Sequence, residues 1–303
     1  MTRMMPARLG AALAALSLLT TAPAPAPAGE AMDRITETNT IRMGFRTDAP
    51  PFSSLVDGQP AGFAIELCMA IGQAMQNQSG NPDLKAELTP MGTGQRFDLI
   101  ASGEVDMLCG ATTATLSRRE LVDFSIPTFT TGVAALTRKD AAEDVTNAIL
   151  GSGRSAESLV NFRTVFAGRT IGVRRDTTAE AWLNDAVIAN DPAIGVEPME
   201  LHISGVEAVL NGQVDAYVAD LAILIGVLRD HERAGDLVLS PRTFTSEPYA
   251  IALPKGDAEL RLAVDRALSE IYRSGLVLRM FEAHFGPVDE HIAFFYATNA
   301  LPE

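Results

Sequence analysis

Residues 109–127 read CGATTATLSRRELVDFSIP, and the rest of the chain is organised around this stretch. It follows the end of an expected strand and begins with small and hydroxyl residues, which let backbone amides and hydroxyls approach a ligand closely. Ser117 and Glu120 have the spacing of a capping box, so a short helix is expected there, with Thr115 or Ser117 as its N-cap. Arg118 in the first turn of that helix opposes the helix dipole and therefore needs an anionic partner. Taken alone, the stretch also fits a capped helix with exposed arginines.

The order of these parts closely resembles a motif of the amino-acid-binding proteins of bacterial ABC importers. The motif is Thr-Thr-x-Thr-x-x-Arg118, and Asp-Phe-Ser-x-Pro begins five residues later at Asp123. The resemblance covers roughly residues 40–286 and recurs at several separate motifs. It implies an α/β, two-lobed periplasmic-binding-protein-like (type II) fold with two hinge crossings, which also occurs in glutamate receptor ligand domains. It further implies that Arg118 holds the α-carboxylate of an amino acid.

The first 28 residues have the pattern of an export signal. Arg3 and Arg8 flank an apolar core over residues 9–19, and Ala-Pro-Ala at 26–28 fits a cleavage site. The core is too short to span a bilayer, and no cysteine follows it that would carry a lipid anchor. Removing two arginines takes the formal charge from −14 to −16, which argues against nucleic acid and anionic lipid as partners. We therefore expect a soluble, monomeric, periplasmic protein.

Two cysteines, Cys68 and Cys109, are expected to form a disulfide, because pairs of cysteines in exported proteins are usually bridged. Cys68 falls on an expected helix and Cys109 on the strand before the central motif, so both would lie in one lobe. Two buried thiols are the alternative. The four histidines show no ligand spacing with either cysteine, so neither a metal nor another cofactor is expected.

The order of elements is strand, helix, strand, helix, strand over residues 40–109, which is typical of an α/β sheet with ligand loops at the strand ends. Gly103-Glu-Val-Asp and Gly212-Gln-Val-Asp repeat a pattern, which favours two lobes of similar build. The polar region 138–168 is expected to hold a variable helical or loop insertion. We expect a signal peptide over 1–28, lobe 1 over 29–137, lobe 2 over 138–247 and a return to lobe 1 over 248–303. Strands of the later part are expected over 131–137, 170–173, 197–202, 214–218, 237–239 and 247–254.

An amino acid offers an α-carboxylate and an α-ammonium group. Arg118 and Thr113 suit the carboxylate, and Ala111 can contribute only its backbone. Asp220, which follows an expected strand of the other lobe, is the candidate for the ammonium group. The resemblance supports this role, because the family holds the ammonium at an aspartate after Gly-x-Val-Asp-Ala. The alternative is that Asp220 only caps the next helix.

Two further arginines, Arg46 and Arg96, lie at loop ends. Three converging arginines repel one another unless the ligand carries a second anion, which favours a dicarboxylic amino acid. The segment Gly-Phe-Arg46-x-x-x-x-Pro-Phe-Ser, with Cys-Gly-Ala-Thr-Thr, resembles the glutamate/aspartate-binding branch, which implies that Arg46 meets the side-chain carboxylate. The same branch uses a hydroxyl residue, an arginine, a threonine and a histidine at the positions of Thr93, Arg96, Thr178 and His202.

The sequence departs from that branch at a few positions. Thr93 and Ala111 stand where serines are expected, and Arg174-Arg175-Asp176 carries more charge than usual, which bears on side-chain selectivity. Surface ion pairs would also explain Arg46 and Arg96, and a strand-end histidine would explain His202.

The resemblance implies a binding protein that delivers L-glutamate or L-aspartate to the permease of an ABC transporter. Binding of a neutral or other polar amino acid is an alternative. The same fold also hosts a cyclohexadienyl or arogenate dehydratase and the sensor domains of kinases and channels. An enzyme needs a positioned acid or base, and Asp220, already assigned to the ammonium, is the obvious carboxylate, so no enzyme activity is expected. The chain ends without a membrane span, which disfavours a sensor domain.

Overall fold

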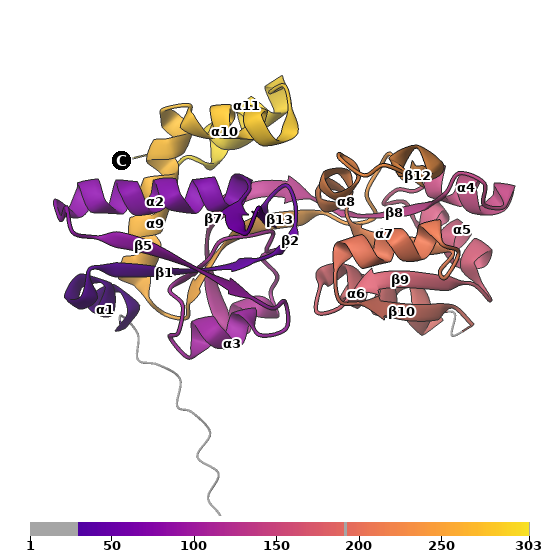
Figure 1. Ribbon diagram of the computed structural model, residues 1–303, viewed down its shortest axis with the longest axis horizontal. Coiled ribbons are helices and arrows are strands. Elements are labelled where there is room, and N and C mark those ends of the chain that lie inside the picture. Colours follow the sequence, from indigo (N-terminus) through magenta and orange to yellow (C-terminus); the bar gives the residue numbers. More distant parts are fainter. Residues whose placement is uncertain (1–29, 191–192, 303) are drawn as a thin grey trace, which may run out of the picture.

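The computed structural model describes residues 30–190 and 193–302, which form two lobes arranged along the long axis of the molecule (Figure 1). The expected export signal lies outside the described residues. Each lobe is built around one five-stranded sheet, with helices on both faces. The α/β two-lobed fold with two hinge crossings is therefore confirmed.

Lobe 1 contains the sheet with strand order β5-β1-β6-β13-β7. β1 runs parallel to β5 and β6, and β13 runs antiparallel to β6 and β7. A small sheet of β2, β3 and β4 lies beside it. The elements are α1 (Glu30–Thr38), β1 (Thr40–Arg46), β2 (Asp48–Ala49), β3 (Ser53–Val56), β4 (Gln59–Ala61), α2 (Phe63–Ser79), β5 (Lys85–Met91), α3 (Arg96–Ala101), β6 (Met107–Leu108), a 3₁₀ helix (Arg118–Glu120), β7 (Val122–Thr131), β13 (Glu247–Pro254), α9 (Ala258–Arg273), α10 (Leu276–Phe285) and α11 (Glu290–Asn299).

Lobe 2 contains the sheet with strand order β10-β9-β11-β8-β12. β9 runs parallel to β10 and β11, and β8 runs antiparallel to β11 and β12. The elements are β8 (Val133–Arg138), α4 (Glu143–Leu150), α5 (Ala156–Phe166), β9 (Thr170–Arg174), α6 (Thr178–Trp182) with a π turn (Leu183–Val187) and a 3₁₀ turn (Ile188–Asn190), β10 (Gly195–Met199), α7 (His202–Leu210), β11 (Ala216–Asp220), α8 (Leu221–Leu228), a 3₁₀ turn (Ala234–Asp236) and β12 (Leu237–Leu239).

The two sheets share one topology, and the repeated sequence pattern occupies the same place in both. Gly103 and Gly212 end a helix with φ of 73° and 70°, a conformation that favours glycine. An aspartate follows three residues after each glycine. Asp106 accepts a hydrogen bond at 2.8 Å from the backbone amide of Arg42 on the neighbouring strand, and Asp215 accepts one at 2.8 Å from the amide of Thr170. The repeat therefore fixes how the middle strand of each sheet joins its neighbour.

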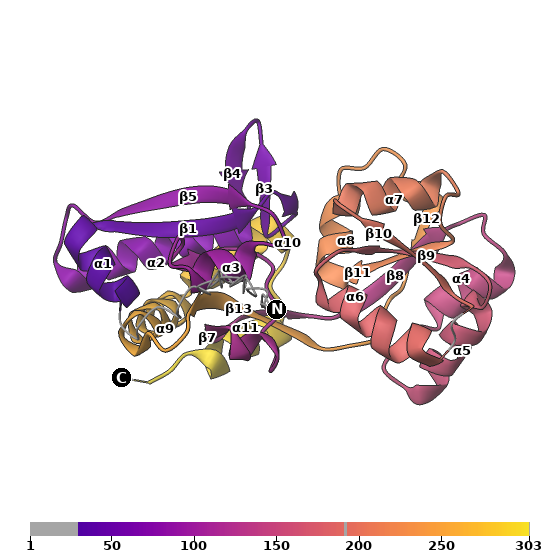
Figure 2. The same cartoon turned by 90° about the horizontal axis from the view of Figure 1, so that it is seen from below.

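The lobes are joined by two segments that run side by side (Figure 2). The first crossing lies at Gly132, because β7 belongs to the first sheet and β8 to the second. A Cβ atom at Gly132 would lie 2.2 Å from the carbonyl oxygen of Thr245 in the second crossing, so only glycine allows this approach. The expected strand over 131–137 is therefore divided between the lobes, and lobe 2 begins about five residues before the expected boundary at 138.

The disulfide between Cys68 and Cys109 is confirmed, with the two Cα atoms 6.0 Å apart. It joins α2 to the end of β6 in the core of lobe 1. The helices α2 and α9 each bury a face of apolar residues at helical spacing, for example Leu67 and Ile71 on α2 and Leu260 and Val264 on α9.

Three local expectations are wrong. The region 138–168 is helical, one of the two forms expected, but it is not an insertion, because α4 and α5 bury Ile149 and Phe162 in the core of lobe 2. His202 does not end a strand but begins α7, since β10 already ends at Met199. The capping box at Ser117 is absent, because Ser117 makes no cap hydrogen bond. Of the two expected caps, Thr115 makes the bond: its Oγ1 accepts from the backbone amide of Arg118 at 3.2 Å.

Candidate functional site

A narrow cavity lies where the two lobes meet. Its free volume is only about 10 Å³, because charged side chains from both lobes fill it. Eight of the nine predicted ligand residues line it, and the ninth, Thr93, is buried beside it. The lining consists of Arg46, Arg96, Ala111, Thr113, Arg118, Thr177, Thr178, Ala179, His202, Ala219, Asp220 and Ile223.

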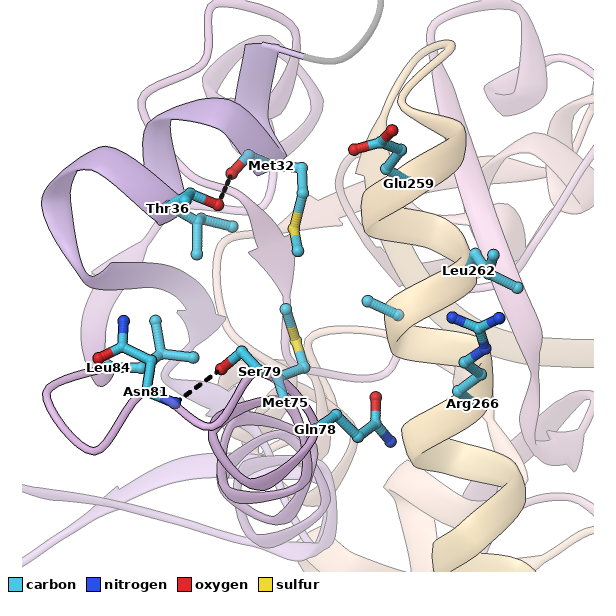
Figure 3. Close-up of a pocket in the computed structure, with 12 residues that line it drawn as sticks. Met32, Thr36, Met75, Gln78, Ser79, Asn81, Leu84, Glu259, Leu262 and Arg266 are labelled. Carbon is cyan, nitrogen blue, oxygen red and sulfur yellow. Dashed lines mark hydrogen bonds between the residues drawn. The ribbon is translucent and has the colours of Figure 1, made fainter.

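A larger cavity of about 500 Å³ lies away from the cleft, between α1, α2 and α9 (Figure 3). Its lining is rich in methionine and aliphatic side chains, such as Met32, Met75 and Leu262. The hydrogen bonds drawn there stay local: Thr36 bonds to the carbonyl of Met32, and Asn81 to the hydroxyl of Ser79. This lining gathers no set of arginines and carboxylates like that between the lobes, so we place the functional site between the lobes.

The central stretch reaches the cavity because it pairs with the return strand β13. The amide of Ala250 donates to the carbonyl of Thr112 at 3.0 Å, and the amide of Ala114 donates to the carbonyl of Pro248 at 2.8 Å. These bonds hold Thr113 at the point where the chain re-enters lobe 1. The hydroxyl-rich sequence thereby faces the opposite lobe, and Thr113 Oγ1 lies 3.4 Å from Thr178 Oγ1 across the cleft.

Arg118 and Arg96 form one end of the site. Their guanidinium carbons lie 5.2 and 4.5 Å from the ring centre of Phe97, so both cations are held against one aromatic ring. Arg118 donates to the carbonyl of Thr113 at 2.8 Å, and Arg96 donates to the carbonyl of Asp176 in the opposite lobe at 2.7 Å. Burial lowers the pKa of both groups, and the charge of Arg118 lowers that of Arg96 further. Neither has an ion-pair partner in the part of the chain that the structure describes.

Asp220 lines the cavity from lobe 2 and carries a raised pKa. Its Oδ2 accepts a hydrogen bond from the hydroxyl of Tyr249, while its buried Oδ1 has no partner among the described residues. Burial, and then the negative charge of Glu247, raise the pKa of Asp220 to about 6, although the bond from Tyr249 acts against this. Asp220 makes no side-chain cap bond to α8, so the interpretation as a plain N-cap is wrong.

Glu247 adds a second buried carboxylate close to Asp220. Its Oε1 accepts from the hydroxyl of Thr245 at 2.9 Å, and within the described residues its buried Oε2 has no hydrogen-bond donor. Two carboxylate oxygens without donors in one buried region leave a place that a cation with several N–H groups would satisfy.

Arg46 and His202 close the side of the site. Arg46 lies 2.9 Å from Asp48 Oδ1, and its Nη2 lies 3.1 Å from His202 Nε2. Burial, and then the charge of Arg46, lower the pKa of His202 to about 3, so the imidazole is neutral at physiological pH. Because arginine can only donate, Nε2 of the ring accepts, and Nδ1 carries the proton that it donates to the hydroxyl of Tyr217 at 2.9 Å.

Arg174, at the end of β9, bridges the lobes with all of its nitrogen atoms engaged. Its Nε donates to Asp48 Oδ2 at 2.8 Å and its Nη2 to Thr93 Oγ1 at 2.8 Å, both in lobe 1. Its Nη1 donates to the carbonyl of Met199 at 3.2 Å in its own lobe. The hydroxyl of Thr93, expected to face a ligand, is therefore bonded to a protein group in this closed arrangement.

Four residues of the lining were not predicted as binding residues: Thr177, Ala179, Ala219 and Ile223. Five further residues that contact or charge the lining were not predicted either: Asp48, Phe97, Arg174, Glu247 and Tyr249. Arg174 belongs to a run that carries more charge than is usual in the glutamate/aspartate-binding branch, and Asp48 is two residues from Arg46. The sequence therefore offered a signal for both residues. Glu247 and Tyr249 had none, because their place depends on how β13 returns to lobe 1.

The described residues contain no group of histidine, cysteine, aspartate or glutamate side chains arranged to hold a metal ion. Among the described helices, none combines the length and the apolar character needed to cross a membrane.

Comparison with known proteins identifies the family of this chain. The chain matches the model of the bacterial extracellular solute-binding proteins, family 3, over residues 41–287. An L-glutamate/L-aspartate-binding protein of Pseudomonas aeruginosa is 26% identical over 256 residues, 84% of this chain and 79% of that protein. An L-cystine-binding protein of Escherichia coli is 24% identical over 257 residues, 84% of this chain and 86% of that protein.

Among solved structures, an ancestral amino-acid-binding protein described as a precursor of cyclohexadienyl dehydratase superposes with a TM-score of 0.68. It is 25% identical, and the alignment covers 85% of this chain and 100% of that one. Because the family model spans most of the sequence, this chain belongs to the bacterial extracellular solute-binding proteins, family 3.

Proposed function

We propose that the protein captures an acidic L-amino acid, glutamate or aspartate, between its lobes and delivers it to the permease of an ABC importer. The observation that carries this proposal is the pair of arginines on Phe97, of which Arg96 is buried and Arg118 half-buried. Arg96 and Arg118 bond to backbone carbonyls, and neither forms an ion pair with a described carboxylate. Buried cations of this kind call for anions, and two arginines suit a ligand with two carboxylates.

Each charged group of the ligand has its own partner in the site. Arg118, with the hydroxyl and backbone of Thr113, takes the α-carboxylate, and Ala111 contributes its backbone. Asp220 takes the α-ammonium, with Glu247 supporting it by charge. Arg96 takes the side-chain carboxylate, with Arg46, Thr178 and His202 around it.

Relatives support the choice of ligand class only in part. The Pseudomonas aeruginosa relative is named for glutamate and aspartate, whereas the Escherichia coli relative is named for cystine. The dicarboxylate assignment therefore rests on the arginines of this chain. An export signal over residues 1–28 and an acidic net charge fit action in the periplasm as a monomer.

Calorimetry with glutamate, aspartate, glutamine, cystine and arginine tests the proposal. We expect the parent to prefer the dicarboxylates and Arg118→Met to bind none of them. Arg96→Met should lose about 2–4 kcal/mol for glutamate, the cost of removing a buried charged hydrogen bond, and less for glutamine. Arg175→Met is the matched control, because this neighbouring arginine is half exposed and pairs with Glu200. A parent that prefers a neutral or basic amino acid would overturn the acidic assignment.

A dehydratase is the second candidate, favoured by the ancestral structure described as a precursor of such an enzyme. Asp220, with its pKa raised to about 6, has the property that a general acid needs. Turnover assays with prephenate and arogenate distinguish the two candidates, and we expect no turnover above the rate without protein.

A further inference from the structure

Asp48 neutralises the positive charge of Arg46, an arginine that lines the cavity. It accepts from Arg46 Nε at 3.1 Å, and its side chain is 9% exposed. Burial acts to raise the pKa of Asp48, but the arginines around it, chiefly Arg46, lower it overall, so the carboxylate is ionised. Arg46 lines the cavity, yet together with Asp48 it forms a pair without net charge.

Arg174 restores the missing positive charge from the opposite lobe. It occupies the second oxygen of the Asp48 carboxylate, and its own side chain is 7% exposed. We call Arg46, Asp48 and Arg174 the cleft triad. The triad carries one net positive charge. Together with Arg96, the part of the site that we propose for the side-chain carboxylate carries two.

We propose that Arg174 is a specificity-determining positioning residue that sets the preference of the site for a second carboxylate, with Asp48 as its opposing charge. Neither residue lines the cavity, so both act through the charge and the placement of Arg46. This inference rests on the proposed function, because it explains how the site distinguishes an acidic ligand from its amide.

The triad could also act only as a clasp, by which we mean a set of contacts that holds the lobes closed. These two roles predict different affinities for glutamate and glutamine. Glutamate and glutamine have nearly the same size and need the same closure, and they differ by one charge. A clasp changes the affinity for both by the same factor, whereas a charge held in a buried cleft changes their ratio. The ratio of the two affinities therefore measures the effect of the triad's charge, and the affinity for glutamine measures its contribution to closure.

The experiment is a double-mutant cycle measured by calorimetry with glutamate and glutamine. Arg174→Gln should lower the glutamate-to-glutamine ratio about tenfold or more, and Asp48→Asn should raise it. The double variant keeps the same net charge in this part of the site as the parent, so its ratio should return close to the parent value although the clasp is lost. Arg174→Lys keeps the positive charge but loses the planar guanidinium that bonds to three partners at once. It should lower the affinity for both ligands while preserving their ratio.

Arg175→Gln serves as the control, since Arg175 is adjacent in sequence but half exposed. Equal losses for both ligands in Arg174→Gln, or a double variant that resembles Arg174→Gln alone, would overturn the inference. If Asp48→Asn does not fold, Arg174→Gln against Arg174→Lys still decides it, because both variants lose the guanidinium group and only the lysine keeps the positive charge. A parent that binds no dicarboxylate would instead refute the proposed function.

Discussion

At the scale of single residues, the site is unusual in leaving buried carboxylate oxygens without donors. Asp220 Oδ1 and Glu247 Oε2 are both buried, and the described residues offer them no donor. Buried acceptors without partners cost about 1–3 kcal/mol each, more when charged. The unliganded site is therefore destabilised at one point, and a bound ammonium group would recover that energy on binding.

The raised pKa of Asp220 leads to a prediction about pH. Binding an ammonium requires the ionised carboxylate, so affinity should fall about tenfold per pH unit as the pH drops below 6. Stability should change in the opposite sense. A carboxyl whose folded pKa lies above its ordinary value stabilises the unliganded fold below that ordinary value, and this contribution is lost as the pH rises through 6.

Calorimetry and thermal melting between pH 5 and 8 measure both effects. Asp220→Asn should bind weakly at every pH, and the stability of the parent relative to this variant should rise as the pH falls from 8 to 5. His202 does not change the affinity in this range, because the buried ring stays neutral down to a pKa of about 3. It does lower the stability of both proteins below pH 6.5, where the unfolded histidine takes up a proton, so the comparison of parent and variant isolates Asp220. Affinity that stays constant from pH 5 to 8 would contradict the role of Asp220.

At the scale of elements, regular patterns could be predicted from the sequence and contacts between distant segments could not. The apolar faces of α2 and α9, the middle strands marked by Asp106 and Asp215, and the disulfide follow from local spacing and compartment. The split of the 131–137 strand could not be predicted, since a strand that crosses between lobes has the same apolar pattern in either sheet.

The same limit applies to the site. Charge arguments selected four residues that line the cavity, namely Arg46, Arg96, Arg118 and Asp220, and the resemblance to the glutamate/aspartate-binding branch added Thr178 and His202. They could not reveal that Asp48 meets Arg174 across 126 positions or that Tyr249 meets Asp220. Those contacts depend on the closed arrangement of the lobes and on the return of β13, which no local pattern encodes.

The disulfide joins a helix to a strand, so its removal should act on stability rather than on ligand contacts. Cys68 and Cys109 are 41 positions apart, and a loop of that length corresponds to about 4 kcal/mol in the chain-entropy account. The double variant Cys68→Ser with Cys109→Ser should lose up to that amount in urea unfolding while its ligand selectivity is kept. A loss below about 1 kcal/mol would show that the packed core, and not the cross-link, holds α2 on β6.

At the scale of the whole molecule, an acidic protein concentrates positive charge in its cleft. The sequence carries a formal charge of −14, yet Arg46, Arg96, Arg118 and Arg174 are buried or nearly so where the lobes meet. Closure brings these groups together, since the bonds from Arg174 to Asp48 and from Arg96 to Asp176 both cross between lobes. Opening of the lobes therefore breaks the bonds that hold Arg174 and Arg96 in place.

Closure can be tested apart from ligand contacts at Gly226 in α8 of lobe 2. A Cβ atom there would lie 2.4 Å from the carbonyl oxygen of Pro50 and 2.4 Å from Cδ of Pro51, both in the lobe 1 loop. Alanine suits a helix interior better than glycine by about 1 kcal/mol, so Gly226→Ala should leave the fold of lobe 2 intact. It should instead hold the lobes apart, because backbone atoms of the facing loop cannot move aside as a flexible side chain does.

We expect Gly226→Ala to weaken ligand binding about ten- to a hundredfold, which corresponds to an overpacking cost of about 1–3 kcal/mol. Its melting temperature without ligand should equal or exceed that of the parent, whereas the rise on adding ligand should shrink, since that rise follows affinity by mass action. Small-angle scattering should show less contraction on adding ligand than in the parent. Gly235→Ala is the matched control, because a Cβ atom there meets nothing within 4 Å in the same lobe. If Gly226→Ala contracts and binds like Gly235→Ala, the contact between α8 and the Pro50–Pro51 loop does not limit closure, and the lobes must close by a different path.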